Sequence, residues 1–146
     1  MSKSIVPIIA RIRTNSYVTS NLAYTIDAST YYRVFGGTRP QEVADLPCVV
    51  VSESNEQSIQ NFSGTTSPTL CKVKVLSIAA TYQVSKTLAN NIRNVLENAS
   101  YTTSSITVSR AVLTNSSDTV YQEKGGERTP TFGVIQFYDV LISEPM

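Results

Sequence analysis

The chain has 146 residues, among them 12 basic and 11 acidic side chains, so its formal net charge is +1. This length predicts one domain over residues 1–146 with a single hydrophobic core. The charges are spread along the chain without a basic cluster, which excludes tight nucleic-acid binding by the isolated protomer, and the absence of histidine excludes Ser-His and Cys-His nucleophile pairs.

The first predicted element is a helix that Ser4 caps. Its apolar face is formed by four isoleucines at helical spacing: Ile5, Ile8, Ile9 and Ile12. Pro7 is tolerated only within the first turn, so the helix is expected to begin close to Ser4. We expect it to continue through Val18 and Leu22.

Three strands are predicted next. Residues 31–35 form a short strand that Gly36-Gly37 ends, and residues 47–51 form a β-branched strand that is apolar on both faces. The polar residues 52–68 are predicted to be a long loop, a length that is usually functional or mobile. Residues 70–78 form the third strand, in which apolar residues alternate with lysines.

The second half of the chain contains the clearest helix, residues 83–99, followed by strands at 105–113 and 131–142. Between these two strands, residues 118–130 form a polar hairpin tip with Gly125-Gly126 for tight turning. The order of helix, three strands, helix and two strands predicts an α+β fold. We expect an antiparallel β-sheet of about four to five strands with two helices packed on one face.

The last strand has an unusual pattern, because it is apolar on both sides, whereas a half-exposed antiparallel strand alternates apolar with polar residues. One side carries Phe132, Val134, Gln136, Tyr138, Val140 and Ile142, and the other carries Gly133, Ile135, Phe137, Asp139 and Leu141. If helices cover the first side, the second needs another cover, from the chain itself or from a neighbouring subunit. The pattern alone leaves both interpretations open.

The residues offer little for catalysis. Cys48 and Cys71 are too few for a disulfide framework or a four-cysteine metal site, and both lie in apolar runs, so we expect them to be reduced and buried on neighbouring strands. Two carboxylate pairs are present in predicted polar loops: Glu53 with Glu56, and Glu123 with Glu127. We predict no catalytic residue, no metal and no cofactor, and therefore a protein that is not an enzyme. A small carboxylate-dependent enzyme is the less favoured alternative.

Residues 33–41, Arg-Val-Phe-Gly-Gly-Thr-Arg-Pro-Gln, are followed by Leu-Pro-Cys-Val-Val-Val at 46–51. This pattern resembles the small tail-completion (tail terminator) proteins of long-tailed bacteriophages. These typically show an Arg-aliphatic-aromatic strand, a Gly/Pro/Gln loop and a Leu-Pro step into an apolar strand. The resemblance continues through the later elements and covers nearly the whole chain, but the segment 52–68 is longer and more polar than is usual in that family.

The resemblance implies a virion protein of the tail or neck, assembled in the bacterial host cytoplasm. Such proteins form a ring, commonly of six subunits, at the head-proximal end of the tail tube, where they end tube polymerisation and join tail to head. The implied partners are other copies of the chain, the tail-tube protein and a head-completion or connector protein, with DNA passing through the lumen without specific binding. No segment approaches the ~18 apolar residues of a membrane helix, so no membrane partner is expected.

A head-tail adaptor or stopper, or a tail-tube subunit of the same virion, remains an open alternative to the terminator. A closed ring needs two complementary patches on each protomer and no active site. The residues that we expect at the assembly interface are Ile135, Phe137, Glu53, Gln57, Phe62, Gln122, Lys124 and Arg128.

Overall fold

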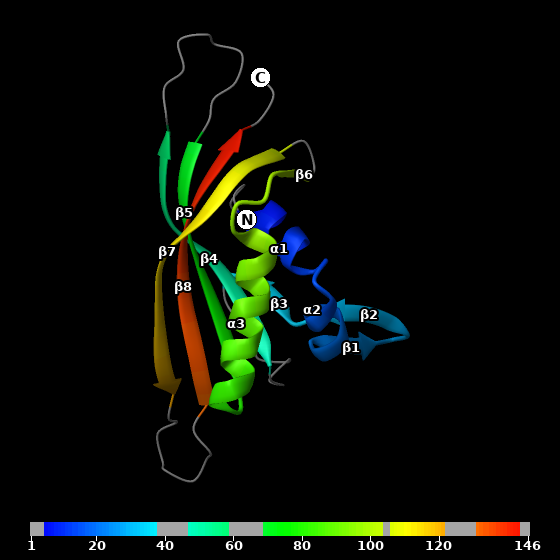
Figure 1. Ribbon diagram of the computed structural model, residues 1–146. Helices are drawn as coiled ribbons and strands as arrows, with labels where there is room; N and C mark the ends of the chain where they lie inside the picture. Colours follow the sequence, from blue (N-terminus) through cyan, green and yellow to red (C-terminus); the bar gives the residue numbers. More distant parts are fainter. Residues whose placement is uncertain (1–4, 38–46, 59–68, 104–105, 122–130, 144–146) are drawn as a thin grey trace.

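The computed structural model describes residues 5–37, 47–58, 69–103, 106–121 and 131–143 (Figure 1). The described helices are α1 (Ile5–Ile12), α2 (Ser16–Asn21) and α3 (Tyr82–Leu96). A six-stranded sheet contains, in spatial order, β3 (Val34–Gly36), β4 (Cys48–Ser58), β5 (Thr69–Ala79), β8 (Thr131–Ser143), β7 (Ile106–Tyr121) and β6 (Tyr101–Thr103). A separate two-stranded sheet contains β1 (Ala23–Ile26) and β2 (Ser29–Tyr32).

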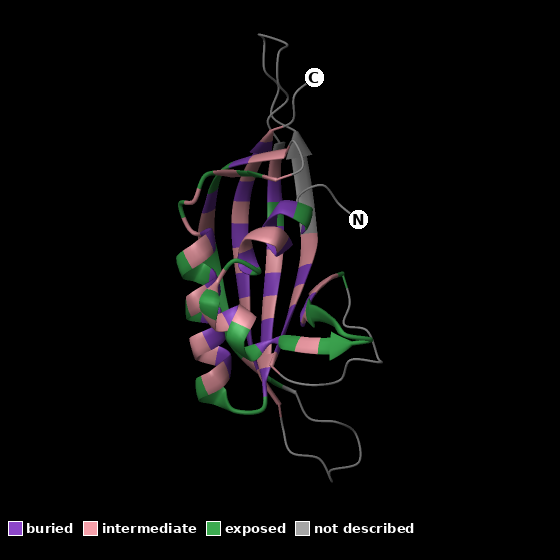
Figure 2. Ribbon diagram, turned by 90° about the vertical axis from the view of Figure 1, so that its right-hand side faces the viewer, coloured by how far each residue is buried: buried purple, intermediate pink, exposed green. Residues whose placement is uncertain are grey.

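The α+β class predicted from the sequence is confirmed. The helices lie on one side of the six-stranded sheet (Figures 1 and 2), and its strand pairs are antiparallel except for the parallel pair of β3 and β4. The described residues contain more strands than the expected four to five, and three helices where two were expected.

The prediction of one continuous helix from Ser4 through Leu22 is wrong. The side-chain oxygen of Asn15 accepts hydrogen bonds from the backbone N–H groups of Tyr17 (2.9 Å) and Val18 (3.2 Å), which makes Asn15 the N-cap of α2. An asparagine side chain that satisfies these N–H groups favours a new helix start over continuation of the first helix. Val18 and Leu22 still reach the core.

The predicted strand at residues 31–35 is divided at Arg33. The residues before Arg33 belong to the β1–β2 hairpin, which the sequence analysis did not predict, and the residues after it form β3 beside β4. The Arg33 side chain is 8% exposed and donates hydrogen bonds to the carbonyl oxygens of Pro47 (2.9 Å), Asn21 (3.0 Å) and Ala23 (3.4 Å). These bonds fasten the chain at the point where it passes from one sheet to the other.

Two strands are longer than predicted. Residues 52–58, which were expected in a loop, continue β4. Residues 114–121 continue β7 into the segment that was expected to be a hairpin tip. Polar residues pair as well as apolar ones here, because each strand has a long neighbour that accepts and donates backbone hydrogen bonds. The polarity of a segment is therefore a poor guide to where these strands end. The helix predicted at 83–99 ends earlier, at Leu96, and β6 was not predicted.

The hydrophobic core lies between the helices and one face of the six-stranded sheet (Figure 2). It includes side chains from α1, α3, β5 and β8: Ile5, Ile8, Ile9, Ile12, Leu88, Ile92, Leu96, Val73, Val75, Tyr138 and Val140. Cys48 on β4 and Cys71 on the neighbouring β5 are both reduced and buried, which confirms the prediction made for them.

Candidate assembly surface

The side chains on the two sides of β8 differ in how far they are buried. Val134, Gln136, Tyr138, Val140 and Ile142 are buried. The residues between them, Ile135, Phe137 and Leu141, are only partly buried. Since successive side chains of a strand point to opposite faces, the helices cover the first set and leave the second on the far side of the sheet.

The strand register extends this second side across the sheet. Val50, Leu76 and Ile135 lie opposite one another on β4, β5 and β8, and Phe35 on β3 pairs with Val50. Ile78 and Phe137 lie in the rows on either side. We call the partly exposed apolar set Phe35, Val50, Leu76, Ile78, Ile135 and Phe137 the open face. Among the described residues, no helix or strand lies over it (Figure 1).

Polar residues border the open face. Lys74 lies opposite Phe137 on one side and Ser52 on the other, and Lys72 lies opposite Asp139. On β7 the same rows continue with the exposed Asn115 and Ser117. An apolar centre with a polar rim is the usual arrangement of a protein–protein interface.

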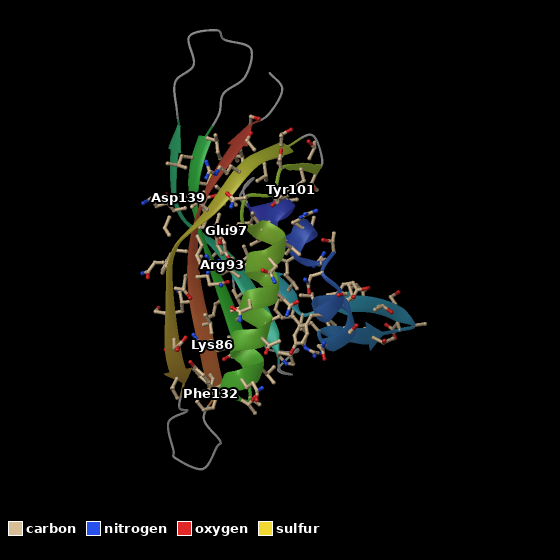
Figure 3. All side chains as sticks on the ribbon, viewed as in Figure 1. Lys86, Arg93, Glu97, Tyr101, Phe132 and Asp139 are labelled. Carbon is tan, nitrogen blue, oxygen red and sulfur yellow. The ribbon has the colours of Figure 1, made fainter. Side chains whose placement is uncertain are left out.

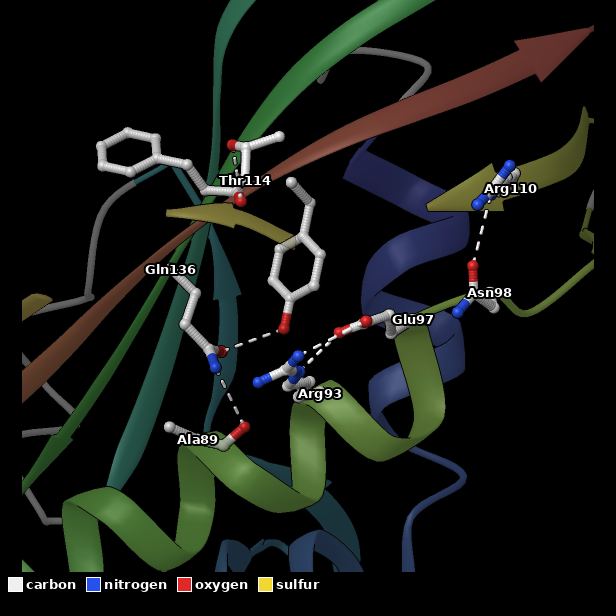
Figure 4. Close-up of polar contacts among 9 residues, drawn as sticks. Ala89, Arg93, Glu97, Asn98, Arg110, Thr114 and Gln136 are labelled. Atoms are coloured by element: carbon white, nitrogen blue, oxygen red, sulfur yellow. Dashed lines mark hydrogen bonds and ion pairs between the residues drawn. The ribbon is translucent and has the colours of Figure 1, made fainter. Parts of the chain in front are cut away.

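The covered side of β8 is held by a buried polar network (Figure 4). The Tyr138 hydroxyl donates to the Gln136 side-chain oxygen (3.2 Å), and the Gln136 nitrogen donates to the Ala89 carbonyl oxygen of α3 (3.2 Å). Burial raises the pKa of the Tyr138 phenol, so this group stays neutral and able to donate. On the neighbouring strand, the Thr114 hydroxyl donates to the backbone carbonyl of Phe137 (3.1 Å) at a β-bulge, which fixes the backbone from which the open face projects.

The last residues of β7 and the first residues of β8 contact the start of α3 (Figure 3). Lys86 forms an ion pair with Asp118 (2.6 Å), the Tyr82 hydroxyl donates to Asp118 (3.1 Å), and the rings of Tyr82 and Phe132 meet edge to face. The hydrogen bond between Lys86 and Asp118 raises the pKa of the lysine and lowers that of the carboxyl. These contacts hold the helix layer against one side of the sheet.

The structure brings together two of the residues predicted at an assembly interface, Ile135 and Phe137, which both lie on the open face. Glu53 lies opposite the buried Val73 at a β-bulge, outside the rows of Ile135 and Phe137, and Gln57 pairs with Leu70 near the end of β4. Four predicted residues lie outside the described residues: Phe62, Gln122, Lys124 and Arg128.

Sequence reasoning did not assign Phe35, Val50, Leu76 and Ile78 to this surface. A signal was present, because residues 47–51 are apolar on both faces and the alternation in residues 70–78 disappears after Val75. The exposed β1–β2 hairpin was also missed. Its two-residue turn is Asp27-Ala28, and alanine is not a residue that usually indicates a turn.

The described residues give no indication of a metal site, since they contain no group of three or more His, Cys, Asp or Glu side chains that would hold an ion. Within the same residues, no helix has the length and apolar character needed to cross a membrane.

Comparison with known proteins shows similarity in fold. No family model and no curated protein matches the chain. A solved chain from the virion of a native gene transfer agent (GTA) particle superimposes with a TM-score of 0.60 at 12% sequence identity, over 97% of this chain and 99% of that chain. The fold is therefore that of a whole chain found in a virion particle.

Proposed function

We propose that this chain is a structural, non-enzymatic subunit of a phage-like particle, which assembles with its own copies into a closed ring. Its finer role is that of a tail terminator, which ends tube polymerisation at the head-proximal end of the tail and joins the tail to the head. The fold shared with a chain of a gene transfer agent virion supports the structural role. The motif at residues 33–51 supports the terminator role within it.

The observation that carries the proposal is the open face. An apolar sheet face left in water loses the stabilisation of about 25 cal/mol for each Å² of apolar surface that a partner would bury. Its two central β8 residues, Ile135 and Phe137, are held by a strand whose other side is already packed and hydrogen-bonded. The strand therefore cannot turn these side chains inward, and a neighbouring subunit is the cover that we propose.

The open face does not form a whole interface by itself. With strands about 4.8 Å apart and residues about 3.3 Å apart along each strand, it covers on the order of 200–400 Å². A stable interface buries about 800 Å² on each partner. The proposed ring contact therefore includes further residues around Ile135 and Phe137, and we retain Glu53, Gln57, Phe62, Gln122, Lys124 and Arg128 as candidates for it.

The experiment is native mass spectrometry and negative-stain electron microscopy of the purified full chain, alone and with tail tubes. We expect rings of one defined stoichiometry. A protein that stays monomeric at high concentration and with tubes present contradicts the proposal. Long tubes formed by the chain alone would instead identify a tail-tube subunit.

Phe137→Asp tests the surface. A carboxylate placed in an apolar contact costs several kcal/mol, so we expect a folded protomer that does not assemble and particles whose heads and tails stay unjoined. The matched control is Val120→Asp, since Val120 is 55% exposed and lies outside the open face. Unfolding of the isolated Phe137→Asp monomer would place Phe137 in the protomer core, and normal assembly would place the interface elsewhere.

A further inference from the structure

The β1–β2 hairpin presents an apolar surface of its own. Tyr24 and Tyr31 are register partners whose rings stack with centroids 5.7 Å apart, and Ile26 lies on the same face, two residues along β1. Ile26 is 49% exposed and Tyr31 is 47% exposed, which are high values for large hydrophobic residues. We call Tyr24, Ile26 and Tyr31 the arm face.

The hairpin is weakly supported by the rest of the protomer. It forms its own two-stranded sheet and, beyond Tyr32 and the contacts around Arg33, projects away from the body of the molecule (Figure 1). An isolated two-stranded hairpin is marginally stable in water. Its turn also places Asp27 and Ala28 at φ of 50° and 67°, a left-handed conformation that costs alanine free energy. A marginal, strained and apolar element of this kind is typical of a segment that gains its stability from a partner.

The arm face and the open face lie on opposite sides of the protomer. The hairpin is on the helix side and points away from the six-stranded sheet, whereas the open face is on the far side of that sheet (Figure 1). Neither surface can cover the other within one copy. Two different apolar patches on opposite sides of the protomer satisfy the requirement of a head-to-tail contact, which closes into a ring when the rotation between copies allows it.

The charges of the two surfaces are complementary. Asp27, at the hairpin tip, is the one charged residue between Ala23 and Tyr32. The open face carries Lys74 opposite Phe137, and Lys74 has no ion-pair partner within the described residues. An arm face seated on the open face would bring an acid at its tip to a surface that presents a lysine.

We propose that the β1–β2 hairpin is an assembly arm whose Tyr24, Ile26 and Tyr31 side chains seat on the open face of a second copy of this chain, with Asp27 near Lys74 of that copy. This inference rests on the proposed self-assembly and names the contact that produces it. It also supplies the additional buried surface that the open face lacks as a stable interface.

A mixing experiment tests the arm. The double variant Ile26→Ser/Tyr31→Ser has a defective arm and an intact open face, and Phe137→Asp has the reverse. Ile26→Ser and Tyr31→Ser each remove an exposed side chain from the contact and should each weaken assembly on the order of tenfold. Phe137→Asp should weaken it more, because it places a carboxylate in an apolar contact. We therefore expect each variant alone to be monomeric by native mass spectrometry. An equimolar mixture should form a 1:1 heterodimer that grows no further, because one competent arm then meets one competent face. Val120→Ser is the control for loss of an exposed hydrophobic side chain and should assemble like the wild type.

The outcomes separate this inference from the proposed function. If the wild type forms rings and the arm variant forms the same rings, the hairpin is not the contact, although the ring proposal stands. If the two variants remain monomeric when mixed, the arm does not seat on the open face. If the wild type itself never assembles, the proposed function fails first.

Charge reversal tests the tip. Asp27→Lys and Lys74→Asp should each weaken assembly, and the double variant Asp27→Lys/Lys74→Asp should recover most of the loss in the dissociation constant. Losses that simply add in the double variant would contradict the placement of Asp27 near Lys74.

Discussion

The phenol of Tyr138 donates a hydrogen bond to the side-chain oxygen of Gln136 across 3.2 Å, and both side chains are buried on the helix-covered side of β8. The two residues are separated along β8 by Phe137, which faces the other way. The bond that anchors the covered side therefore also determines the orientation of the open face.

We expect Gln136→Leu to lower the free energy of unfolding by about 1–3 kcal/mol, because it leaves the Tyr138 hydroxyl buried without its acceptor. Replacing both partners by apolar residues is often nearly neutral, so the double variant Gln136→Leu/Tyr138→Phe should recover much of this loss. Urea unfolding of Gln136→Leu, Tyr138→Phe and the double variant measures the coupling free energy between the two side chains. Additive losses would show that the two side chains do not act as a pair.

Tyr101 should make the protein sensitive to alkaline pH. Burial raises the pKa of its phenol from 10.0 to about 12, so the folded state favours the neutral form. The resulting stabilisation is fully present below pH 10 and is lost as the pH rises towards about 12. Tyr101→Phe removes this dependence. The free energy of unfolding of the variant relative to the wild type should therefore increase between pH 10 and pH 12, and urea unfolding across that range measures it.

The same variant should be no less stable than the wild type near pH 8. Among the described residues, the Tyr101 hydroxyl is buried without a hydrogen-bond partner, and an unsatisfied buried hydroxyl costs about 1–3 kcal/mol. The cation–π contact of Arg11 with the ring, at 5.2 Å, is available to phenylalanine as well. A clear loss of stability on Tyr101→Phe would indicate that the hydroxyl is satisfied in solution.

Cys48 and Cys71 should be protected in the folded protein. Both are buried thiols outside any disulfide, so a thiol reagent should modify them slowly under native conditions and rapidly in denaturant. Replacing either by Ser buries a more polar group and should cost about 1–3 kcal/mol. Rapid modification of both thiols without unfolding would contradict their burial.

Much of the fold was determined by local patterns. The isoleucines of α1 and the stripe Leu88, Ile92 and Leu96 of α3 predicted their own buried faces, because helical spacing places them on one side whatever they pack against. The alternation of apolar and polar residues in β5 and the two-sided apolar pattern of β8 likewise predicted which side chains of these strands share a face. These patterns sufficed for the α+β class and for the expectation that β8 needs a cover on each side.

Other features depend on partners that are distant in sequence. The division at Arg33 rests on carbonyl groups of Asn21, Ala23 and Pro47, and the polar ends of β4 and β7 are strands because long neighbours pair with them. The turn of the β1–β2 hairpin, Asp27-Ala28, has alanine where a two-residue turn usually has glycine, so the sequence did not indicate it.

The sequence by itself determined that β8 is apolar on both sides, and only the tertiary structure decided which side is which. The choice follows from α3, whose Ala89 carbonyl accepts the amide of Gln136 and so draws the Gln136 and Tyr138 side of the strand into the core. Periodicity cannot specify this, because a period of two is the same for both faces of a strand. The face that carries Ile135 and Phe137 is left open because a single layer of helices covers one side of a sheet.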